Sequence, residues 1–312
     1  MQELYKELKN YGHVRPGALM SKYTTFHIGG PVQFMVEVKE NDKLVVLLNY
    51  LMGEGISYFV LGGGSNLLWQ DDEWEGVVIK VQSEKIKVQN NVIEAEAGAS
   101  FAAMVMTAVQ NNLAGLEWAA GMPGTVGGAV RGNAGAMESD TGRSLERIEV
   151  WRDGEVMILK PEDCEYGYRD SAFKRNTDVI LRAWFKTVPG DKIALMQTMQ
   201  ATIRGRNGKY PASPSAGSFF KNIDVSAWSG DRSKLPEKFL TTGKIPAGWI
   251  NEQNGLKGFA VGGAKVSDEH GNFLINYNGA TQQDVLGVVE EVQKRVYDTF
   301  KVALDTEVVI KQ

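Results

Sequence analysis

Two glycine clusters hold the residue types best suited to chemistry. The first is Gly62, Gly63 and Gly64, followed directly by Ser65 and Asn66. Glycine allows left-handed backbone angles and lets a ligand come close to bare N–H groups. Several N–H groups that point one way form an anion-binding nest, and Ser65 and Asn66 add side-chain donors. Taken alone, three glycines fit a tight structural turn equally well.

The second cluster, at residues 121–128 with a further glycine at 135, favours the ligand-binding interpretation. Two nests in one domain suit a ligand with two or more phosphates and predict a dinucleotide site. The pattern differs from the nicotinamide fingerprint, which needs G-x-G-x-x-G between a strand and a helix; here residues 66–69 continue as loop or strand. The candidate residues of the second cluster are Gly121, Pro123, Gly124, Thr125, Gly127, Gly128 and Gly135.

The bulk composition sets the class of protein. A length of 312 residues allows two or three domains of roughly 100–150 residues each. The formal net charge of -4 gives no support for a nucleic-acid partner. A single cysteine, Cys164, excludes an intrachain disulfide and fits a reducing compartment. The three histidines lie far apart, which disfavours a zinc site, and no stretch approaches the roughly 20 apolar residues of a membrane span. We therefore expect a cytoplasmic protein with no membrane partner.

The elements that position the first cluster read as strand, helix, strand. Residues 33–38 alternate as a strand, Asp42 caps a helix that runs to Leu51, and 58–61 return as a strand. Residues 77–81 continue the strand-rich pattern, and a helix capped by Ser100 is predicted over 101–110.

Two hairpins and further regular elements follow. The hairpins turn at Asn90-Asn91 and at Asp153-Gly154, within residues 86–95 and 148–159. A strand is predicted over 180–187, a helix over 191–204, a short helix over 246–253, a long helix with one apolar face over 282–300, and a last strand over 307–310. Residues 208–217 are too rich in glycine, proline and serine for regular structure, so we place a domain boundary near them.

The motifs of the chain, taken in order, resemble the UDP-N-acetylenolpyruvoylglucosamine reductase family. They extend from near residue 24 to the end of the chain, and their common order carries the resemblance, because each alone is weak. The segments are TTFHIGG at 24–30, LGGGSNLL at 61–68, GMPGTVGG at 121–128, YGYRDSAFK at 166–174, AGSFFKN at 216–222, AGWI at 247–250, residues 255–264, and LDTEV at 304–308.

The resemblance implies a fold, a cofactor and a reaction. The fold is α+β: an FAD-binding fold of the vanillyl-alcohol-oxidase (PCMH) type in two subdomains, plus a smaller α+β substrate-binding domain. The implied division is residues 1–80 joined by the C-terminal strand 302–312, then 81–206, then 207–301 for the substrate. The cofactor is non-covalent FAD, and NADPH is the co-substrate. The hydride passes through FAD to the enolpyruvyl β-carbon of UDP-N-acetylglucosamine enolpyruvate and gives UDP-N-acetylmuramate, a peptidoglycan precursor. We expect a monomer.

Three positions match the catalytic residues of the family. Arg169 matches the cation on the substrate carboxylate, Glu307 the acid near that carboxylate, and Ser218 the general acid that protonates the α-carbon. Without the family frame, Arg169 reads as a structural ion pair, Glu307 as a solvated residue at the start of the last strand, and Ser218 as a loop serine that caps a backbone N–H. A role for Glu307 requires a raised pKa, which burial would cause.

Other positions match the substrate-binding residues of the family. The diphosphate or uridine end of the substrate is assigned to Arg206, Lys209 and Asn222, and solvated loop cations remain the alternative for the first two. Tyr168 lies beside Arg169 in its motif, and His270 matches a polar position near the nucleotide or is a surface histidine.

The chain departs from the family pattern at several points. The stretch from Arg169 to Ser218 is shorter than in the long form, which predicts the short-form subclass without a tyrosine-bearing loop over the substrate. Met137 stands where an aromatic residue is usual, and His27 where a basic residue is usual. Asp305 replaces a more common glutamate.

Two other functions remain open at this point. A flavin oxidase of the same fold, acting on an alcohol or hydroxy acid, would share the glycine nests but would not need Arg169, Ser218 and Glu307 together. A protein that binds a UDP-sugar or flavin without turnover would be expected to lose those three residues.

Overall fold

The computed structural model describes residues 1–206 and 208–312, which divide into two compact units. Among the described residues, unit 1 comprises 1–18, 32–63 and 74–206, and unit 2 comprises 19–31, 64–73 and 208–312. The boundary predicted at residue 207 lies outside the described residues. The division into two flavin subdomains and a substrate domain stays a prediction.

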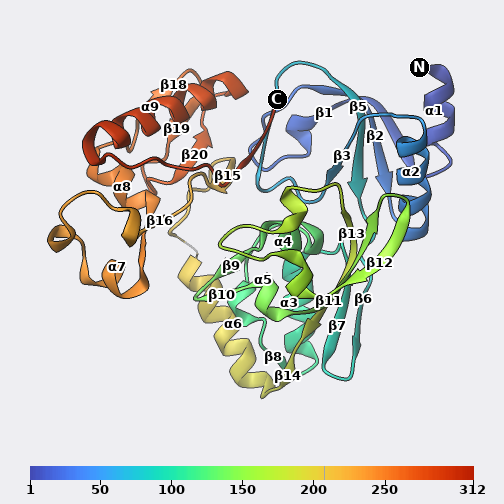
Figure 1. Cartoon of the computed structure of the whole chain (residues 1–312), viewed down its shortest axis with the longest axis horizontal. Coiled ribbons are helices and arrows are strands. Elements are labelled where there is room, and N and C mark those ends of the chain that lie inside the picture. Colours follow the sequence, from blue (N-terminus) through green and yellow to red (C-terminus); the bar gives the residue numbers. More distant parts are fainter. Residues whose placement is uncertain (207) are drawn as a thin grey trace. The chain divides into compact units, whose positions relative to one another are not determined.

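The two largest sheets described in unit 1 have four and five strands, and helices lie beside them (Figure 1). The first sheet has the strand order β1-β2-β5-β3, in which β2, β5 and β3 run parallel. The second has the order β12-β11-β13-β7-β6 and is antiparallel. The elements of unit 1 are α1 (Gln2–Leu8), β1 (His13–Leu19), β2 (Pro31–Val38), α2 (Asn41–Gly53), β3 (Tyr58–Leu61), β5 (Trp74–Val81), β6 (Ile86–Gln89), β7 (Val92–Glu96), α3 (Phe101–Gln110), β8 (Leu113–Ala114), α4 (Val126–Gly132), β9 (Gly135–Ala136), β10 (Ser139–Asp140), α5 (Thr141–Ser144), β11 (Leu145–Arg152), β12 (Glu155–Leu159), β13 (Val179–Lys186), β14 (Val188–Pro189) and α6 (Lys192–Arg206).

The β-α-β unit ahead of the first glycine cluster is confirmed, with one correction. The strands β2 and β3 flank α2, whose buried Leu44, Leu47, Leu48 and Leu51 pack into the core formed with β2 and β5. Asp42 is not the cap: α2 begins at Asn41, the N-cap position is Glu40, and Asp42 lies in the first turn. An acidic residue there still favours the helix, because it faces the positive end of the helix dipole.

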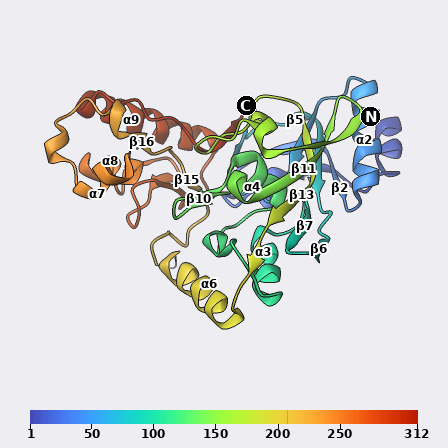
Figure 2. The same ribbon diagram turned by 60° about the horizontal axis from the view of Figure 1, so that its bottom comes forward.

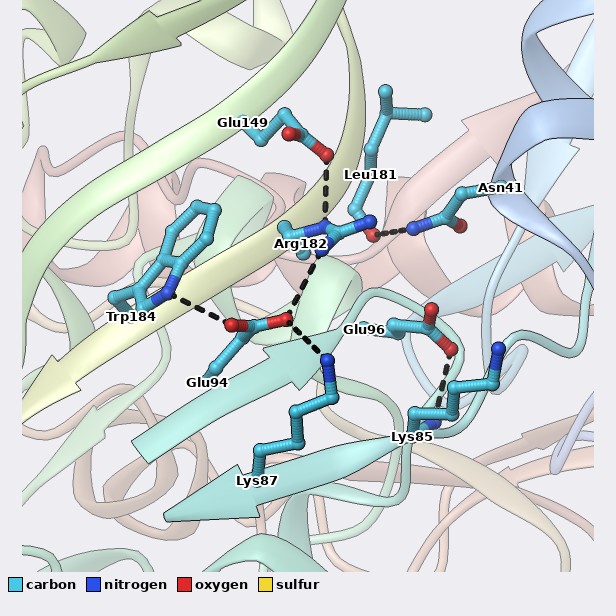
Figure 3. A network of polar contacts seen from close by, with 9 residues as sticks. All are labelled: Asn41, Lys85, Lys87, Glu94, Glu96, Glu149, Leu181, Arg182 and Trp184. Carbon is cyan, nitrogen blue, oxygen red and sulfur yellow. Dashed lines mark hydrogen bonds and ion pairs between the residues drawn. The ribbon is translucent and has the colours of Figure 1, made fainter. Parts of the chain in front are cut away.

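The five-stranded sheet has one apolar face and one charged face. Figures 1 and 2 show α4 beside this sheet, and both α3 and α4 contact β7. On the opposite face Arg182 of β13 forms ion pairs with Glu94 at 3.0 Å and with Glu149 at 2.8 Å, and Trp184 donates its Nε1–H to Glu94 at 3.2 Å (Figure 3). Side chains alternate between the two faces of a strand, so Arg182 and Trp184 lie on the face opposite to that of the buried Ala183 and Phe185.

Both predicted hairpins are present. The turn between β6 and β7 places Asn90 and Asn91 at φ values of 49° and 62°, and Asp153 and Gly154 take 49° and 97° between β11 and β12. Asparagine, aspartate and glycine tolerate the positive φ values that two-residue hairpin turns require, so local turn chemistry fixed both hairpins.

Unit 2 is a smaller α+β unit with its own core. Its largest sheet has the order β15-β20-β19-β18, and α9 packs against β18 and β19. The predicted apolar face of α9 is confirmed, because Val285, Val288, Val292 and Val296 are fully buried. The elements of unit 2 are β4 (Leu67–Trp69), β15 (Ser215–Ser218), β16 (Ile223–Asp224), α7 (Glu237–Thr242), β17 (Lys244–Ile245), α8 (Ala247–Gln253), β18 (Ala260–Val261), β19 (Ala264–Val266), β20 (Phe273–Asn276), α9 (Gln282–Phe300) and β21 (Val309–Lys311).

Two predictions at the edges of unit 2 were wrong in part. Residues 208–217 were expected to be irregular, but β15 begins at Ser215 and pairs with β20. The last strand begins at Val309 rather than at Glu307 and runs parallel to β4. In both places long-range pairing, which local composition does not encode, decides the boundary. Among the described residues no helix is long and apolar enough to cross a membrane.

Candidate flavin and substrate site

Within unit 1, Gly62 and Gly63 of the first glycine cluster lie very close to the second cluster. A Cβ placed on Gly62 would lie 2.5 Å from the Thr125 hydroxyl oxygen, and one placed on Gly63 would lie 2.8 Å from the Gly124 Cα. Only glycine permits such an approach. Segments about 60 positions apart in the sequence therefore form one glycine-lined surface, as the prediction of a single ligand requires.

Carbonyl oxygens of both loops are held from within the unit. The carbonyl of Gly124 accepts from the N–H of Phe101 at 3.1 Å, and the carbonyl of Gly62 accepts from the Lys80 ammonium. Because a trans peptide is planar, its N–H points opposite to its C=O. The N–H groups of Gly63 and Thr125, which share these peptides, are thereby turned away from the groups that hold the carbonyls.

Other predicted glycines support the second loop. The N–H of Gly127 donates to Ala97 at 2.8 Å, and the N–H of Gly128 donates to the Thr125 hydroxyl at 3.4 Å. Gly121 and Gly124 have φ values of 76° and 103°, which other residues rarely adopt. These contacts fix the shape of the loop, whereas a side chain at Gly62 or Gly63 would fill the space between the loops. The glycine-lined surface with oriented N–H groups fits the diphosphate of FAD.

Arg169 lies next to a predicted flavin residue in unit 1. Its Nη2 donates to the carbonyl of Gly135 at 2.6 Å, and its own carbonyl accepts from the Lys174 ammonium at 2.7 Å. Arg169 has a φ of 55°, a conformation that costs energy for a residue with a side chain and that is frequent at functional sites. The guanidinium also lies 5.3 Å from the ring centre of the exposed Tyr168.

Arg206 packs against the second glycine loop within unit 1. At the end of α6 its Nη2 donates to the carbonyl of Trp118 at 3.0 Å. A Cβ on Gly121 would lie 3.5 Å from the Arg206 Cδ, so the arginine packs along the second glycine loop. Lys209, by contrast, belongs to unit 2 and is exposed.

The end of the first loop belongs to unit 2. Gly64 has a φ of 66°, and a Cβ there would lie 2.1 Å from the carbonyl oxygen of Tyr23. Ser65 is half-buried in the turn that leads into β4. Asn66 donates from its Nδ2 to the carbonyl of Glu307 at 3.2 Å, so the side chain predicted to meet the ligand holds the C-terminal segment.

The segments of Ser218 and Glu307 are paired within unit 2. The N–H of Glu307 donates to the carbonyl of Phe219 at 2.8 Å, and Phe220 forms a bridge with Thr306. Glu307 therefore lies opposite the residue that follows Ser218, although the two are almost 90 positions apart. Both Ser218 and Glu307 are half-buried, and Phe219 and Phe220 anchor the pair in the core.

Asn222 and His270 have structural contacts in unit 2. The Oδ1 of Asn222 accepts from the N–H of Ala247 at 3.2 Å, where α8 begins. The His270 Nδ1 accepts from the N–H of Asn272 at 3.1 Å, and burial lowers the pKa of the imidazole below its ordinary value. His270 also packs edge-on against Phe273, with the ring centres 4.9 Å apart.

Sequence reasoning missed two residues of these surroundings. Lys80 is the only charged residue in the apolar run 77–81, and this isolated charge could have identified it as a candidate residue of the site. Tyr210 stacks on Phe273 with ring centres 5.0 Å apart at 22°, beside His270. No local pattern identifies this second contact, because Tyr210 and Phe273 are distant in sequence.

Two family models match separate parts of the chain. Residues 31–159 match the family model described as FAD binding domain, and residues 209–311 match that of the UDP-N-acetylenolpyruvoylglucosamine reductase C-terminal domain. The crystal structure of UDP-N-acetylenolpyruvylglucosamine reductase from Thermus caldophilus superposes with a TM-score of 0.78 at 30% identity and covers 96% of this chain and 99% of its own. The fold is therefore the FAD-binding α+β fold that the motifs predicted.

Curated relatives match over almost the whole chain. UDP-N-acetylenolpyruvoylglucosamine reductase from Caldanaerobacter subterraneus subsp. tengcongensis is 36% identical over 98% of this chain and 96% of its own. The same-named protein from Clostridium kluyveri is 37% identical over 97% and 94%, and that from Anoxybacillus flavithermus is 35% identical over 99% of both. Because these relatives are 35–37% identical over nearly the whole chain, the chain belongs to the UDP-N-acetylenolpyruvoylglucosamine reductase family.

Proposed function

We propose that this chain is an NADPH-dependent flavoenzyme that reduces the enolpyruvyl group of UDP-N-acetylglucosamine enolpyruvate to the lactyl ether of UDP-N-acetylmuramate. Membership of the family supports the reaction class. The structural observation that carries the proposal is the pairing that holds Glu307 opposite the residue after Ser218. This pairing joins the backbones of the two segments that carry the proposed proton donor and the proposed carboxyl group, so both segments belong to one framework within unit 2.

The glycine loops of unit 1 are the proposed site of the FAD diphosphate. The N–H groups of Gly63 and Thr125 would donate to the phosphates, and the backbone contact between the loops keeps side chains out of the space. When bound, FAD supplies the redox chemistry, since it takes up hydride from NADPH and delivers it to the β-carbon of the substrate. The protein supplies binding, orientation and charge stabilisation.

Arg169 is proposed to stabilise the charge that develops on the substrate. Addition at the β-carbon of an enol ether conjugated to a carboxylate places negative charge on the α-carbon and the carboxylate. A guanidinium is always protonated and can bind a carboxylate through two parallel N–H groups. The bonds to Gly135 and from Lys174 hold the backbone and side chain of Arg169 in place, so little reorganisation is needed during the reaction.

Ser218 is proposed to deliver the proton to the α-carbon. A serine hydroxyl is a weak acid, so the step depends on positioning and on the negative charge at the receiving carbon. The core residues Phe219 and Phe220 fix the backbone next to Ser218. Glu307 is proposed to share a proton near the substrate carboxylate, and its neighbour Asn66 holds the Glu307 carbonyl.

The proposed division of labour is the one that the family resemblance implies. Residues 1–80 with 302–312, and residues 81–206, are proposed to bind FAD, and 207–301 the UDP-sugar through Lys209, Asn222 and His270. The C-terminal strand β21 pairs with β4, which lies within 1–80, and both strands belong to unit 2. Arg206 is proposed to act beside the second glycine loop.

We further propose a monomer that works in the cytoplasm without a nucleic-acid or membrane partner. The net charge of -4 and the single, fully buried Cys164 support this proposal. Sedimentation of the purified chain at several concentrations tests the monomer; a mass twice that of the chain would contradict it.

An anaerobic absorbance experiment tests the reaction. NADPH is added to the flavin-loaded protein, followed by UDP-N-acetylglucosamine enolpyruvate, while the flavin bands are recorded. Bleaching by NADPH and recovery on addition of the sugar support the proposal. Bleaching without recovery points to another flavin oxidoreductase, and a colourless protein that takes up no FAD refutes the proposal.

A further inference from the structure

Lys80 occupies an unusual place for a lysine. It lies on β5, the strand flanked by β2 and β3, where the register sets it opposite Glu37 on one side and Leu61 on the other. Its neighbours on the strand, Ile79 and Val81, are buried. The side chain is half-buried, and its ammonium donates to the carbonyl of Gly62, the first residue after β3.

A half-buried ammonium at this position needs a compensating interaction. Burial lowers the pKa of Lys80, and the charge of Glu37 acts in the opposite direction. Glu37 is itself paired with Arg15 at 2.9 Å, so its charge is shared. If Lys80 were only a residue of the strand, an apolar side chain could replace it without loss of stability. The position of Lys80 under the glycine loop therefore suggests a task in that loop.

The task follows from the geometry of one peptide group. The carbonyl of Gly62 and the N–H of Gly63 belong to the same planar trans peptide and point in opposite directions. A peptide between two glycines rotates easily, because neither residue has a side chain that restricts φ and ψ. The bond from Lys80 to the carbonyl fixes this rotation and turns the N–H of Gly63 away from the lysine.

The second loop uses the same arrangement with a different donor. There the N–H of Phe101 holds the carbonyl of Gly124 and thereby orients the N–H of Thr125. The two peptides are close, since a Cβ on Gly63 would lie 3.6 Å from the nitrogen of Thr125. Lys80 thus does with a side chain what the backbone does at the second loop, and it adds a positive charge.

We propose that Lys80 is a positioning residue for the FAD diphosphate: it fixes the Gly62–Gly63 peptide so that the N–H of Gly63 is presented to the phosphates, and its charge offsets theirs through the peptide. The inference rests on the proposed FAD site. It predicts that Lys80 matters for flavins that carry a diphosphate and not for riboflavin, which has none. A lysine that only stabilised the sheet would affect both equally.

The test compares the affinity of FAD and of riboflavin for the full chain stripped of flavin. The variants are Lys80→Met, which removes donor and charge, and Lys80→Gln, which keeps a donor without charge. Lys43→Met is the matched control, because Lys43 lies in the same unit and is exposed beside Glu40. Thermal unfolding of each flavin-free variant reports on folding.

The expected result is a loss of FAD affinity of about 10-fold or more in Lys80→Met, the range for a hydrogen bond from a charged donor, with riboflavin affinity unchanged. The FAD affinity of Lys80→Gln should lie between those of Lys80→Met and the unmodified chain. Lys43→Met should bind both flavins as the unmodified chain does. Equal weakening of FAD and riboflavin, or unchanged FAD affinity, overturns the proposal. If Lys80→Met fails to fold, the same comparison in Lys80→Gln decides. Failure of the unmodified chain to bind FAD would instead refute the proposed function.

Discussion

Replacement of Gly63 by alanine tests whether the backbone contact between the glycine loops forms the flavin site. The added Cβ would lie 2.8 Å from the Cα of Gly124 and 3.4 Å from its carbonyl carbon. Ordinary contacts of a Cβ begin near 3.4 Å, so the two loops must move apart by roughly 0.6 Å. Both contacts are with backbone, which cannot rotate out of the way as a flexible side chain could.

The magnitude follows from the cost of overpacking. Added methyl groups at closely packed positions cost about 1–3 kcal/mol. If FAD requires the loops at their present separation, that cost appears in binding, and the Kd for FAD rises by about 5- to 150-fold. The φ of Gly63 is not positive, so the effect comes from the contact and not from backbone strain.

The assay is a fluorescence titration of the flavin-free chain with FAD, together with thermal unfolding. Gly132→Ala is the matched control: Gly132 ends α4, close to the second loop in sequence, and a Cβ there meets nothing within 4 Å. Its FAD affinity should equal that of the unmodified chain. Unchanged FAD affinity in Gly63→Ala would refute the assignment of the loops, and equal losses in both variants would refute the argument from contact.

Three further predictions concern catalysis and pH. Ser218→Ala should leave bleaching of the flavin bands by NADPH near normal and slow their recovery by the enolpyruvyl sugar by several orders of magnitude; equal slowing of both stages would contradict a proton-donor role. Arg169→Ala should slow the recovery stage by a loss on the order of a few kcal/mol of stabilisation, and an unchanged recovery rate would remove Arg169 from the site. Burial raises the pKa of Cys164 to about 11, so a disulfide reagent at pH 8 should label the thiol slowly in the folded chain and rapidly in urea. Because the unfolded thiol ionises first as the pH rises from about 9 to 11, folding stability should fall more steeply over that range in the unmodified chain than in Cys164→Ala; equal slopes would contradict the shift.

The parts of the fold that local sequence determines were predicted well. The hairpins at Asn90-Asn91 and Asp153-Gly154 follow from residues that accept positive φ, and α9 follows from valines at helical spacing. Ser100 caps α3 as expected, because its hydroxyl accepts from the N–H of Ala103. In each case the deciding interaction joins residues close in sequence, so the pattern alone contains the information.

The parts that depend on distant partners were predicted less well. The start of β15 at Ser215 is set by pairing with β20, and Glu307 lies before its expected strand because β21 takes its register from β4. The helix start at Asn41 shows a smaller error, since an acidic residue favours both the cap and the first turn. Local composition does not show where a distant partner strand lies, and it does not distinguish a cap residue from a residue of the first turn.

The candidate site combines both kinds of information. The composition of the glycine clusters predicts a phosphate site. The close approach of Gly63 to Gly124 and the hydrogen bond between Glu307 and Phe219 appear only in the folded chain. The same holds for Lys80: its isolated charge in the apolar run 77–81 is visible in the sequence, whereas its partner, the carbonyl of Gly62, is not. A charged residue inside an apolar strand that ends near a glycine loop is therefore a reasonable place to look for a group that orients loop peptides, since burial of the charge requires a specific partner. The comparison of FAD with riboflavin in Lys80 variants would show whether that reading of an isolated charge holds.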